Sequence, residues 1–280
     1  MRKWTLLFIF ILLGLTPTVY GLENAEQKFQ GFNLQGYTDE GEKSWDVEGD
    51  TADINGAEIT LKNVVANSYG ERPMNVTADT GVVNQTTGKM TLEDDVVITS
   101  DDGSKLMTDF VEWDKEQDLV SSDKDVYIKN ESFAATGTGM RAQPGLKNAQ
   151  LNKDVTVRVD TAEPQKETTE AKVPKLLTIT SDGPMTLDQL LLKARFEVNV
   201  TAEQDNQTLK ADIMEIYFKE GMKEVKEMVC LGNVEIIQGE NKTFAEKATY
   251  NAEDQKLTLS GRPKLILETG GQSGLTPLGN

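Results

Sequence analysis

The segment LEDDVVITS, residues 92–100, joins an acidic run to a β-branched strand, and the same pattern recurs along the chain. The other copies are SSDKDVYIK from Ser121, LNKDVTVRV from Leu151, ARFEVNVTA from Ala194, CLGNVEIIQ from Cys230 and LSGRPKLIL from Leu259. Most successive copies begin roughly 30 residues apart, a period typical of stacked units that cannot bury an apolar face alone. In each copy an acidic or Gly-containing turn leads into a strand. The repeat therefore predicts a stack of short antiparallel strands.

The residues around the first copy indicate how such strands pair. In DVVITSDDGSKLMTDFVEW, residues 95–113, Val96 and Ile98 share one face of a strand, and residues 101–104 form a hairpin turn. Leu106 and Phe110 then return on the same face. The alternation predicts a sheet with one apolar side.

Composition excludes several classes of protein. The 280 residues are 38% hydrophobic and 27% charged, as in globular chains, and the net charge of −17 argues against nucleic-acid binding. The chain has no histidine, which excludes Ser-His-Asp and Cys-His catalysis. Cys230 is the single cysteine, so no disulfide can form within the chain, and its apolar neighbours predict a buried structural thiol.

Two acidic clusters invite a calcium hypothesis. Residues 93–95 and 101–102 are carboxylates, but they lack the D-x-D-x-D-G spacing of a dedicated calcium loop. We interpret both as solvated hairpin turns and expect no metal site.

An uncharged N-terminal stretch predicts export from the cytoplasm. Residues 4–22 carry no charge and follow Arg2 and Lys3. As a helix, such a stretch is about 28 Å long, close to the hydrocarbon thickness of about 30 Å, and its positive flank stays in the cytoplasm. We expect it to be retained as an anchor; removal as a signal peptide is the alternative.

Changes in composition divide the rest of the chain. Residues 161–175 lose almost every large apolar side chain and gain Pro, Glu, Lys and Thr, as linkers do. The predicted parts are an anchor or signal segment at 1–22, a first domain at 23–160, a linker at 161–175, a second domain at 176–269 and a disordered tail at 270–280. Two segments with helical propensity, 187–196 and 219–230, lie within the strand array, so we predict strands for both.

Longer motifs occur in a fixed order in each domain. The first domain contains FQGFNLQGYTDEGEKSWDVEGDTADING from Phe29, VTADTGVVNQTTGKMTLEDDVVITSDDGSKLMTDFVEWD from Val76 and DKDVYIKNESFAATGTGM from Asp123. The second contains LTITSDGPMTLD from Leu177, FEVNVTAEQDNQTLKADIMEIYF from Phe196, CLGNVEIIQGENKTFAEKATYN from Cys230 and KLTLSGRPKLILE from Lys256. The first set resembles the LptC family of lipopolysaccharide export, and the second resembles the LptA/OstA family.

The resemblance implies an all-β chain of two β-jellyroll domains, of short antiparallel strands, after one N-terminal transmembrane helix. It implies a non-enzymatic protein without cofactor that takes lipopolysaccharide from an inner-membrane ABC transporter and carries it across the periplasm. The expected partners are lipopolysaccharide, the permease subunits, and an LptA-like bridge protein or the outer-membrane receptor. The alternatives are a structural β-sandwich scaffold without a lipid path and, less favoured, a carbohydrate-active enzyme with paired carboxylates.

The residues expected to contact lipid are apolar and alternate along strands, since acyl chains need an apolar lining. They are Val96, Ile98, Leu106, Phe110, Val126, Ile128, Met214, Ile216, Phe218, Val234, Ile236, Leu257 and Leu259. For any one of them a core position is the plainer interpretation. Trp45 and Trp113 are expected either at the groove mouth or in the core.

Sheet edges are the expected contacts with partner proteins, because joining edges satisfies unpaired backbone groups. Ile59 and Leu61 mark the expected N-terminal edge, and Leu265 and Leu267 mark the C-terminal edge. The expected location is the inner membrane, with one span and the bulk of the chain in the periplasm; soluble periplasmic protein is the alternative.

Overall fold

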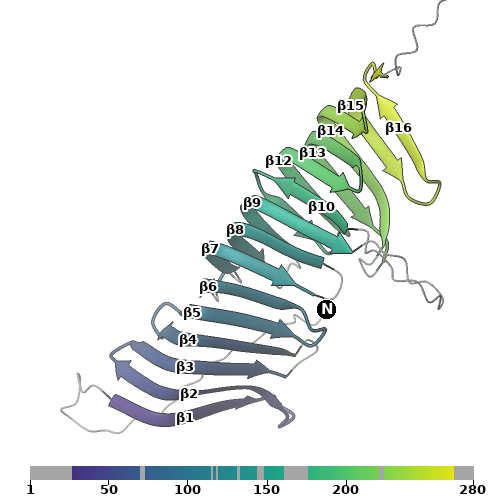
Figure 1. The fold of residues 1–280 in the computed structure, drawn as a ribbon. Coiled ribbons are helices and arrows are strands. Elements are labelled where there is room, and N and C mark those ends of the chain that lie inside the picture. The colour runs from purple at the N-terminus through teal and green to yellow at the C-terminus, as the bar shows by residue number, and fades with distance from the viewer. Residues whose placement is uncertain are drawn as a thin grey trace, which may run out of the picture.

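The computed structural model describes residues 27–69, 73–114, 116–117, 119–130, 133–143, 148–160, 176–220 and 224–267. Within these residues the chain forms one 17-stranded antiparallel sheet and no helix, which confirms the all-β prediction (Figure 1). The predicted anchor at 1–22, linker at 161–175 and tail at 270–280 lie outside the described residues.

Most strands are long rather than short. The first nine are β1 (Gln27–Tyr37), β2 (Lys43–Asn55), β3 (Glu58–Ser68), β4 (Met74–Asn84), β5 (Lys89–Ser100), β6 (Lys105–Asp114), β7 (Leu119–Lys129), β8 (Phe133–Gln143) and β9 (Asn148–Asp160). The others are β10 (Leu176–Ser181), β11 (Met185–Asp188), β12 (Lys193–Gln204), β13 (Gln207–Phe218), β14 (Val225–Gln238), β15 (Asn241–Asn251), β16 (Lys256–Ser260) and β17 (Lys264–Ile266). Of the two segments with helical propensity, 187–196 is strand on both sides of a turn at 189–192, and the second is strand from Val225 onward, so its described residues form no helix.

The strands pair in chain order to form an elongated ladder (Figure 1). At two positions in the sheet, two short strands take the place of one long strand. β10 and β11 lie end to end between β9 and β12, and β17 and β16 lie end to end beside β15. Each break contains a proline, Pro184 or Pro263, which has no N–H to donate to a ladder. Pairing of β9 with β10 and β11 carries the sheet across the predicted linker.

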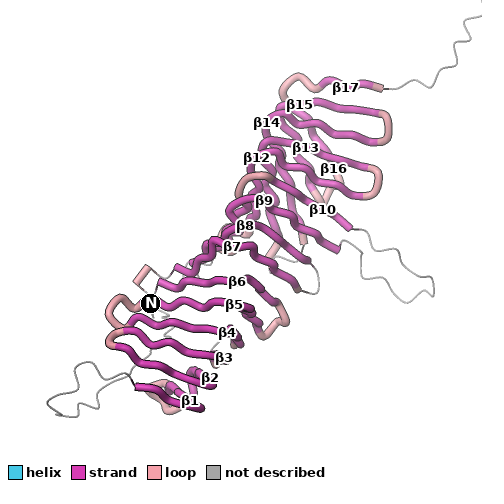
Figure 2. Tube along the Cα trace, turned by 60° about the vertical axis from the view of Figure 1, so that its left-hand side comes forward, coloured by secondary structure: helices cyan, strands magenta, loops and turns pink. Residues whose placement is uncertain are grey.

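Long strands bend near their middle, and the repeated motif lies at these bends (Figure 2). Five of the six copies were expected at turns between strands, and this part of the prediction is wrong, because they lie inside β5, β7, β9, β12 and β14. In β5 the bend consists of Asp94 and Asp95, whose φ angles are 61° and 48°. Asp and Asn tolerate this left-handed conformation better than most residues, which explains the acidic composition.

Each bend of this kind turns three consecutive residues outward between two inward ones. In β5 the inward residues are Leu92 and Val96, and in β14 they are Cys230 and Val234. The valine that follows each bend is almost fully buried: Val96 1%, Val126 2%, Val155 1%, Val200 0% and Val234 1% exposed. The repeat thus encodes a bend and the core residue behind it.

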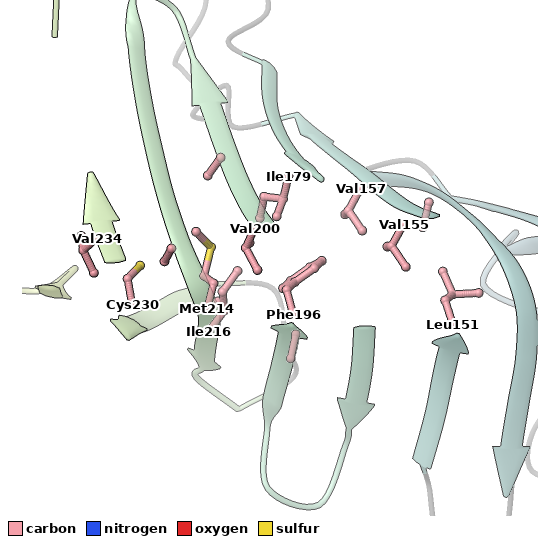
Figure 3. Close-up of a cluster of buried hydrophobic side chains, with 14 of the residues drawn as sticks. Leu151, Val155, Val157, Ile179, Phe196, Val200, Met214, Ile216, Cys230 and Val234 are labelled. Carbon is pink, nitrogen blue, oxygen red and sulfur yellow. The ribbon is translucent and has the colours of Figure 1, made fainter. Parts of the chain in front are cut away.

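The aligned bends fold the sheet lengthwise into a trough with two arms. Arm A contains Ile98, Leu106 and Ile128, and arm B contains Met90, Trp113 and Val120, on the other side of the bends. Apolar side chains from both arms meet in one buried cluster, in which Ile179 of arm A and Phe196 of arm B participate (Figure 3). The two apolar faces therefore form the inside of the trough.

The largest buried cluster crosses the predicted domain boundary. It begins at Val126 on β7 and extends to Ala248 on β15, so it spans residues on both sides of 161–175. Two smaller clusters cover the strands before β7. Ladder pairing between β6 and β7 is interrupted from Thr108 to Glu112, at the same place where the large cluster begins.

Candidate functional site

A row of side chains, apolar except for one threonine, follows the inside of arm A from the first described strand to the last. Each residue in this row is the direct cross-strand partner of the next. The row consists of Leu34, Val47, Ala66, Val76, Ile98, Leu106, Ile128, Ala135, Val157, Ile179, Ala202, Leu209, Ile236, Thr243 and Leu265. Thr243 is its single polar member, and it carries a methyl group.

A second row follows the inside of arm B in the same way. Its members are Ile54, Ile59, Val83, Met90, Trp113, Val120, Ala142, Ala149, Leu187, Ala194, Ile216, Met228, Tyr250 and Leu257. Side chains opposite each other on neighbouring strands are about 5 Å apart, so each row offers continuous apolar surface.

Burial divides the predicted lipid-contact residues into two groups. Five of them lie near the bends and are buried: Val96, Val126, Met214, Ile216 and Val234. Ile98, Leu106, Ile128, Phe218, Ile236 and Leu259 face the same interior but are only half-buried. A buried position is core packing, whereas the exposed part of a half-buried inward side chain lies at the mouth of the trough, where a ligand can reach it.

Phe110 corrects the prediction for β6. It was expected to share a face with Leu106, but Phe110 pairs with the exposed Glu93, while the next residue, Val111, pairs with Leu92 and is 5% exposed. The bend of β6 turns Asp109 and Phe110 outward and moves the inward face onto Val111 and Trp113. Strict alternation along the strand could not anticipate this change of phase.

Leu257 lies on the last paired strand of arm B and is 46% exposed. It continues the inner row through its partner Tyr250, but no described strand covers its other side. Leu257 is therefore both inward-facing and at the C-terminal edge.

The predicted N-terminal edge is wrong. Ile59 and Leu61 are each 3% exposed on β3, which pairs with β2 on one side and β4 on the other. The first strand of the sheet is β1, which has β2 as its single partner among the described strands. The mistake has a simple cause: β1 is rich in Gln, Asn and Gly, so its alternation is weaker than that of β3.

Leu265 and Leu267, which were expected at the C-terminal edge, lie at the last described strand of the sheet. Leu265 and Leu267 are 59% and 58% exposed, on and just after β17, which pairs with β15 alone among the described strands. Ile266, at 43% exposed, adds to this apolar surface.

Two aromatic side chains cover glycines at the N-terminal end of the sheet. Trp45 is 9% exposed and its indole lies where a side chain of Gly36 would be, 2.1 Å from the Cβ position. The ring of Phe32 lies over Gly49 in the same way, 2.7 Å from its Cβ position. These contacts fix β1 on β2, and they place Trp45 in the core of this end rather than free at the mouth.

Side-chain hydrogen bonds connect neighbouring strands along the line of bends. Asn63, Asn199 and Asn233 have left-handed φ angles of 52°, 51° and 46°. Their side-chain amides donate to Asp50, Asp182 and Asp212, at 2.5, 2.7 and 2.9 Å. Carboxylates at the bends therefore accept bonds from neighbouring strands, and the described residues contain no cluster of three or more metal-ligating side chains.

An ionic network braces the outer face of arm B. Arg195 and Tyr217 donate hydrogen bonds to Glu215, and Lys193 lies 3.4 Å from the same carboxylate. Burial alone would raise the pKa of Glu215, but the bonds from Tyr217, Arg195 and Lys193 outweigh it and lower the pKa. The network faces away from the trough and carries no catalytic geometry.

Cys230 is buried inside the trough, as predicted, with 1% exposed. Burial raises the pKa of its thiol to about 12, so the thiol stays protonated and unreactive at neutral pH.

Several lining residues were missing from the prediction. Val111, Val120 and Leu187 belong to the inner face of arm B, and Val157 and Ile179 to that of arm A. Their apolar alternation is visible in the sequence, but the phase change at each bend had to be known before the inner set could be chosen.

Comparison with known proteins gives two family matches. Residues 20–160 match the model for "Lipopolysaccharide-assembly, LptC-related", and residues 178–274 match "LptA/(LptD N-terminal domain) LPS transport protein". A solved structure of LptH, an LptA homologous periplasmic component from Pseudomonas aeruginosa, is 14% identical and covers 71% of this chain and 97% of its own. Its TM-score of 0.19 is too low to carry an argument. No curated protein matches the chain.

The two family matches place this bent antiparallel ladder among the proteins of lipopolysaccharide assembly and transport. The chain belongs to the LptC-related family, and it continues into a segment of the LptA/LptD N-terminal kind. No helix in the part of the chain that the structure describes is long and apolar enough to cross a membrane.

Proposed function

We propose that this chain is a non-enzymatic carrier that binds the acyl chains of lipopolysaccharide inside its trough and passes the lipid along both segments. The two inner apolar rows are the observation that supports the proposal. They run from the first strands to the last and cross from the LptC-related to the LptA-like segment without interruption. Covering apolar surface contributes roughly 25 cal/mol per Å², so acyl chains are favoured along the whole length.

The trough has to widen to admit lipid. Phe196, Val200 and Met214 are 0–1% exposed, so the space near the bends is filled by the protein itself. Half-buried residues nearer the mouth, such as Ile128 and Ile236, are the first that an acyl chain can contact. We infer that the arms separate while lipid passes.

The open ends of the sheet are the proposed points of transfer. The strand β1 would meet the permease subunits of an ABC transporter, and β16 and β17 would meet an LptA-like bridge protein or the outer-membrane receptor. Among the described strands both ends present backbone groups without a ladder partner, and the C-terminal end adds the exposed Leu265, Ile266 and Leu267. Energy comes from the transporter, because the sequence contains no G-x-x-x-x-G-K-(S/T) loop. Residues 4–22 would anchor the chain in the inner membrane, with the sheet in the periplasm.

Site-specific photo-crosslinking in cells that export lipopolysaccharide tests the proposal. A photoreactive amino acid is placed at Leu106, Ile128 and Ile236 inside the trough, and at Val97 as the outward control. We expect energy-dependent lipid adducts at the inner positions alone.

The scaffold alternative makes the opposite forecast. A closed β-sandwich gives no lipid adduct at any inner position although the protein is folded and abundant. Adducts at Leu106 and Ile128 without any at Ile236 would limit the lipid path to the first segment.

A further inference from the structure

Three positive side chains lie close together in one row on the outer face of arm A. Lys105 on β6 is the direct cross-strand partner of Lys129 on β7, and Ala134 on β8 separates Lys129 from Arg158 on β9. All three cations are exposed. Strands lie about 4.8 Å apart, so Arg158 is about 10 Å from Lys129 across the small side chain of Ala134. We name Lys105, Lys129 and Arg158 the cationic row.

The cationic row lacks internal compensation. None of the three residues makes an ion pair with any described residue, although many other cations of this acidic chain do, such as Lys89 with Glu112. The neighbours in the row on either side, Thr99 and Thr178, are uncharged. Like charges directly opposite on neighbouring strands are destabilising, so the arrangement has a cost in the free protein. A bound anion removes that cost.

The position of the row connects it with the mouth of the trough. Lys105 is the first residue of β6 and Lys129 the last of β7, so both lie at the rim of arm A. Their sequence neighbours Leu106 and Ile128 face inward and are half-buried at the mouth. Long lysine side chains can reach over a rim while their alkyl stems lie against it. One molecule can therefore contact the apolar inside and the charged outside together.

An open hollow lies next to the cationic row on the outer face. Its rim-side lining includes Tyr127 and Thr136, whose hydroxyls can bond to a sugar. On the bend side it is lined by Asp125 and Asp154, which repel a phosphate and accept bonds from sugar hydroxyls. The surface is thus positive at the rim and negative toward the bends. This arrangement fits a sugar whose phosphate points toward the rim.

We propose that the cationic row binds the phosphate of a phosphorylated sugar headgroup while the acyl chains of the same lipid lie against Leu106 and Ile128. This inference rests on the proposed lipid-carrying function and adds a specificity for phosphorylated lipid. It also fixes the orientation of the lipid, with its headgroup over the rim of arm A.

Binding to paired lipids tests the inference. The full-length chain is titrated with a fluorescent bis-phosphorylated lipid A and with the same lipid after enzymatic dephosphorylation. We expect the protein to bind the phosphorylated form about tenfold more tightly, as charge-assisted contacts to one phosphate allow, with a preference that falls as salt rises. The triple variant Lys105→Gln, Lys129→Gln, Arg158→Gln should bind both forms equally.

A second triple variant is the matched control. Lys226→Gln, Lys247→Gln, Lys256→Gln removes the same charge from exposed positions outside arm A and should keep the tenfold preference. If the cationic-row variant keeps the preference, or the control loses it equally, the inference is wrong while the carrier function stands. If the unaltered protein binds neither lipid, both the inference and the proposed carrier function are wrong. If inorganic pyrophosphate binds as tightly as phosphorylated lipid, the row is a site for a free anion and the headgroup assignment is overturned.

Discussion

At the scale of single residues, the fold depends on side chains that accept a left-handed backbone at the bends. Asn233 has this conformation and also donates to Asp212 at 2.9 Å. Val198 has it too, with a φ of 68°, although a β-branched residue is strained there. The same local geometry is thus favourable at one bend and costly at another.

Replacing Asn233 should separate the two contributions. Asn233→Ala is expected to lower the free energy of unfolding by about 1–2 kcal/mol, since it loses a hydrogen bond and gains left-handed strain. Asn233→Gly loses the bond alone and should cost less than half as much. Urea unfolding of the two variants measures this. Equal losses would show that backbone conformation does not matter at this bend.

Val198 offers the converse test. It is 51% exposed, so little packing is lost when it is replaced. Val198→Asn should raise the free energy of unfolding by about 1 kcal/mol, because asparagine relieves left-handed strain. Thermal unfolding gives the measurement, and a lower midpoint than that of the unaltered chain would contradict the argument.

The buried thiol predicts an alkaline loss of stability. The pKa of Cys230 rises from 9.0 to about 12 on folding, so the unfolded chain ionises first. The stabilisation is complete below pH 9 and is lost as the pH rises toward 12, by up to about 1.4 kcal/mol per pH unit. Urea unfolding of the unaltered chain and of Cys230→Ala measures this. Between pH 8 and pH 10.5 the free energy of unfolding should fall further in the unaltered chain than in the variant. Parallel pH profiles would contradict the burial of the thiol.

At the scale of the element, the bends decide which face of a strand is inside. A straight β6 would place Phe110 with Leu106, but the bend gives the inner position to Val111. Because the long strands repeat this change of phase, the two arms present apolar faces to each other. A sheet without bends would expose one of them to water.

Two substitutions in β6 test the change of phase. Val111→Ser should cost about 2–4 kcal/mol, because it opens a cavity and buries a hydroxyl. Phe110→Ser should cost under about 1 kcal/mol, as most outward positions do. Chemical denaturation of both variants compares them directly, and the reverse order of losses would restore the straight-strand interpretation.

At the scale of the whole molecule, the two family segments form one continuous body. Ladder pairs join β9 to β10 and β11, and the largest buried cluster includes Val157 and Ile179 across the join. The weaker seam lies inside the LptC-related segment, where the gap in pairing between β6 and β7 is longer than at other bends, from Thr108 to Glu112 and from Ser121 to Val126. There the buried Thr108 and Ser122 bond to each other in place of apolar contact.

Cutting the chain should reveal this continuity. With a protease site placed within 161–175, the nicked halves are expected to co-elute as one species in size-exclusion chromatography without denaturant. A second variant has its protease site between β6 and β7, at residues 115–118. After cleavage there, the halves should separate at a lower urea concentration than the halves cut within 161–175. Free separation of the halves after the first cut would show two independent domains.

The sequence by itself determined the all-β class, the repeat, the burial of Cys230 and the family, because apolar alternation and local residue preferences are short-range properties. Only the tertiary structure decided that the acidic motifs are bends within strands, that Phe110 faces out and that Ile59 and Leu61 lie inside the sheet. Each of these depends on how a strand meets its neighbours: a bend shifts the alternation, and an edge exists only where no further strand pairs. The cationic row has the same origin, since cross-strand pairing brings together Lys105, Lys129 and Arg158 from separate parts of the sequence.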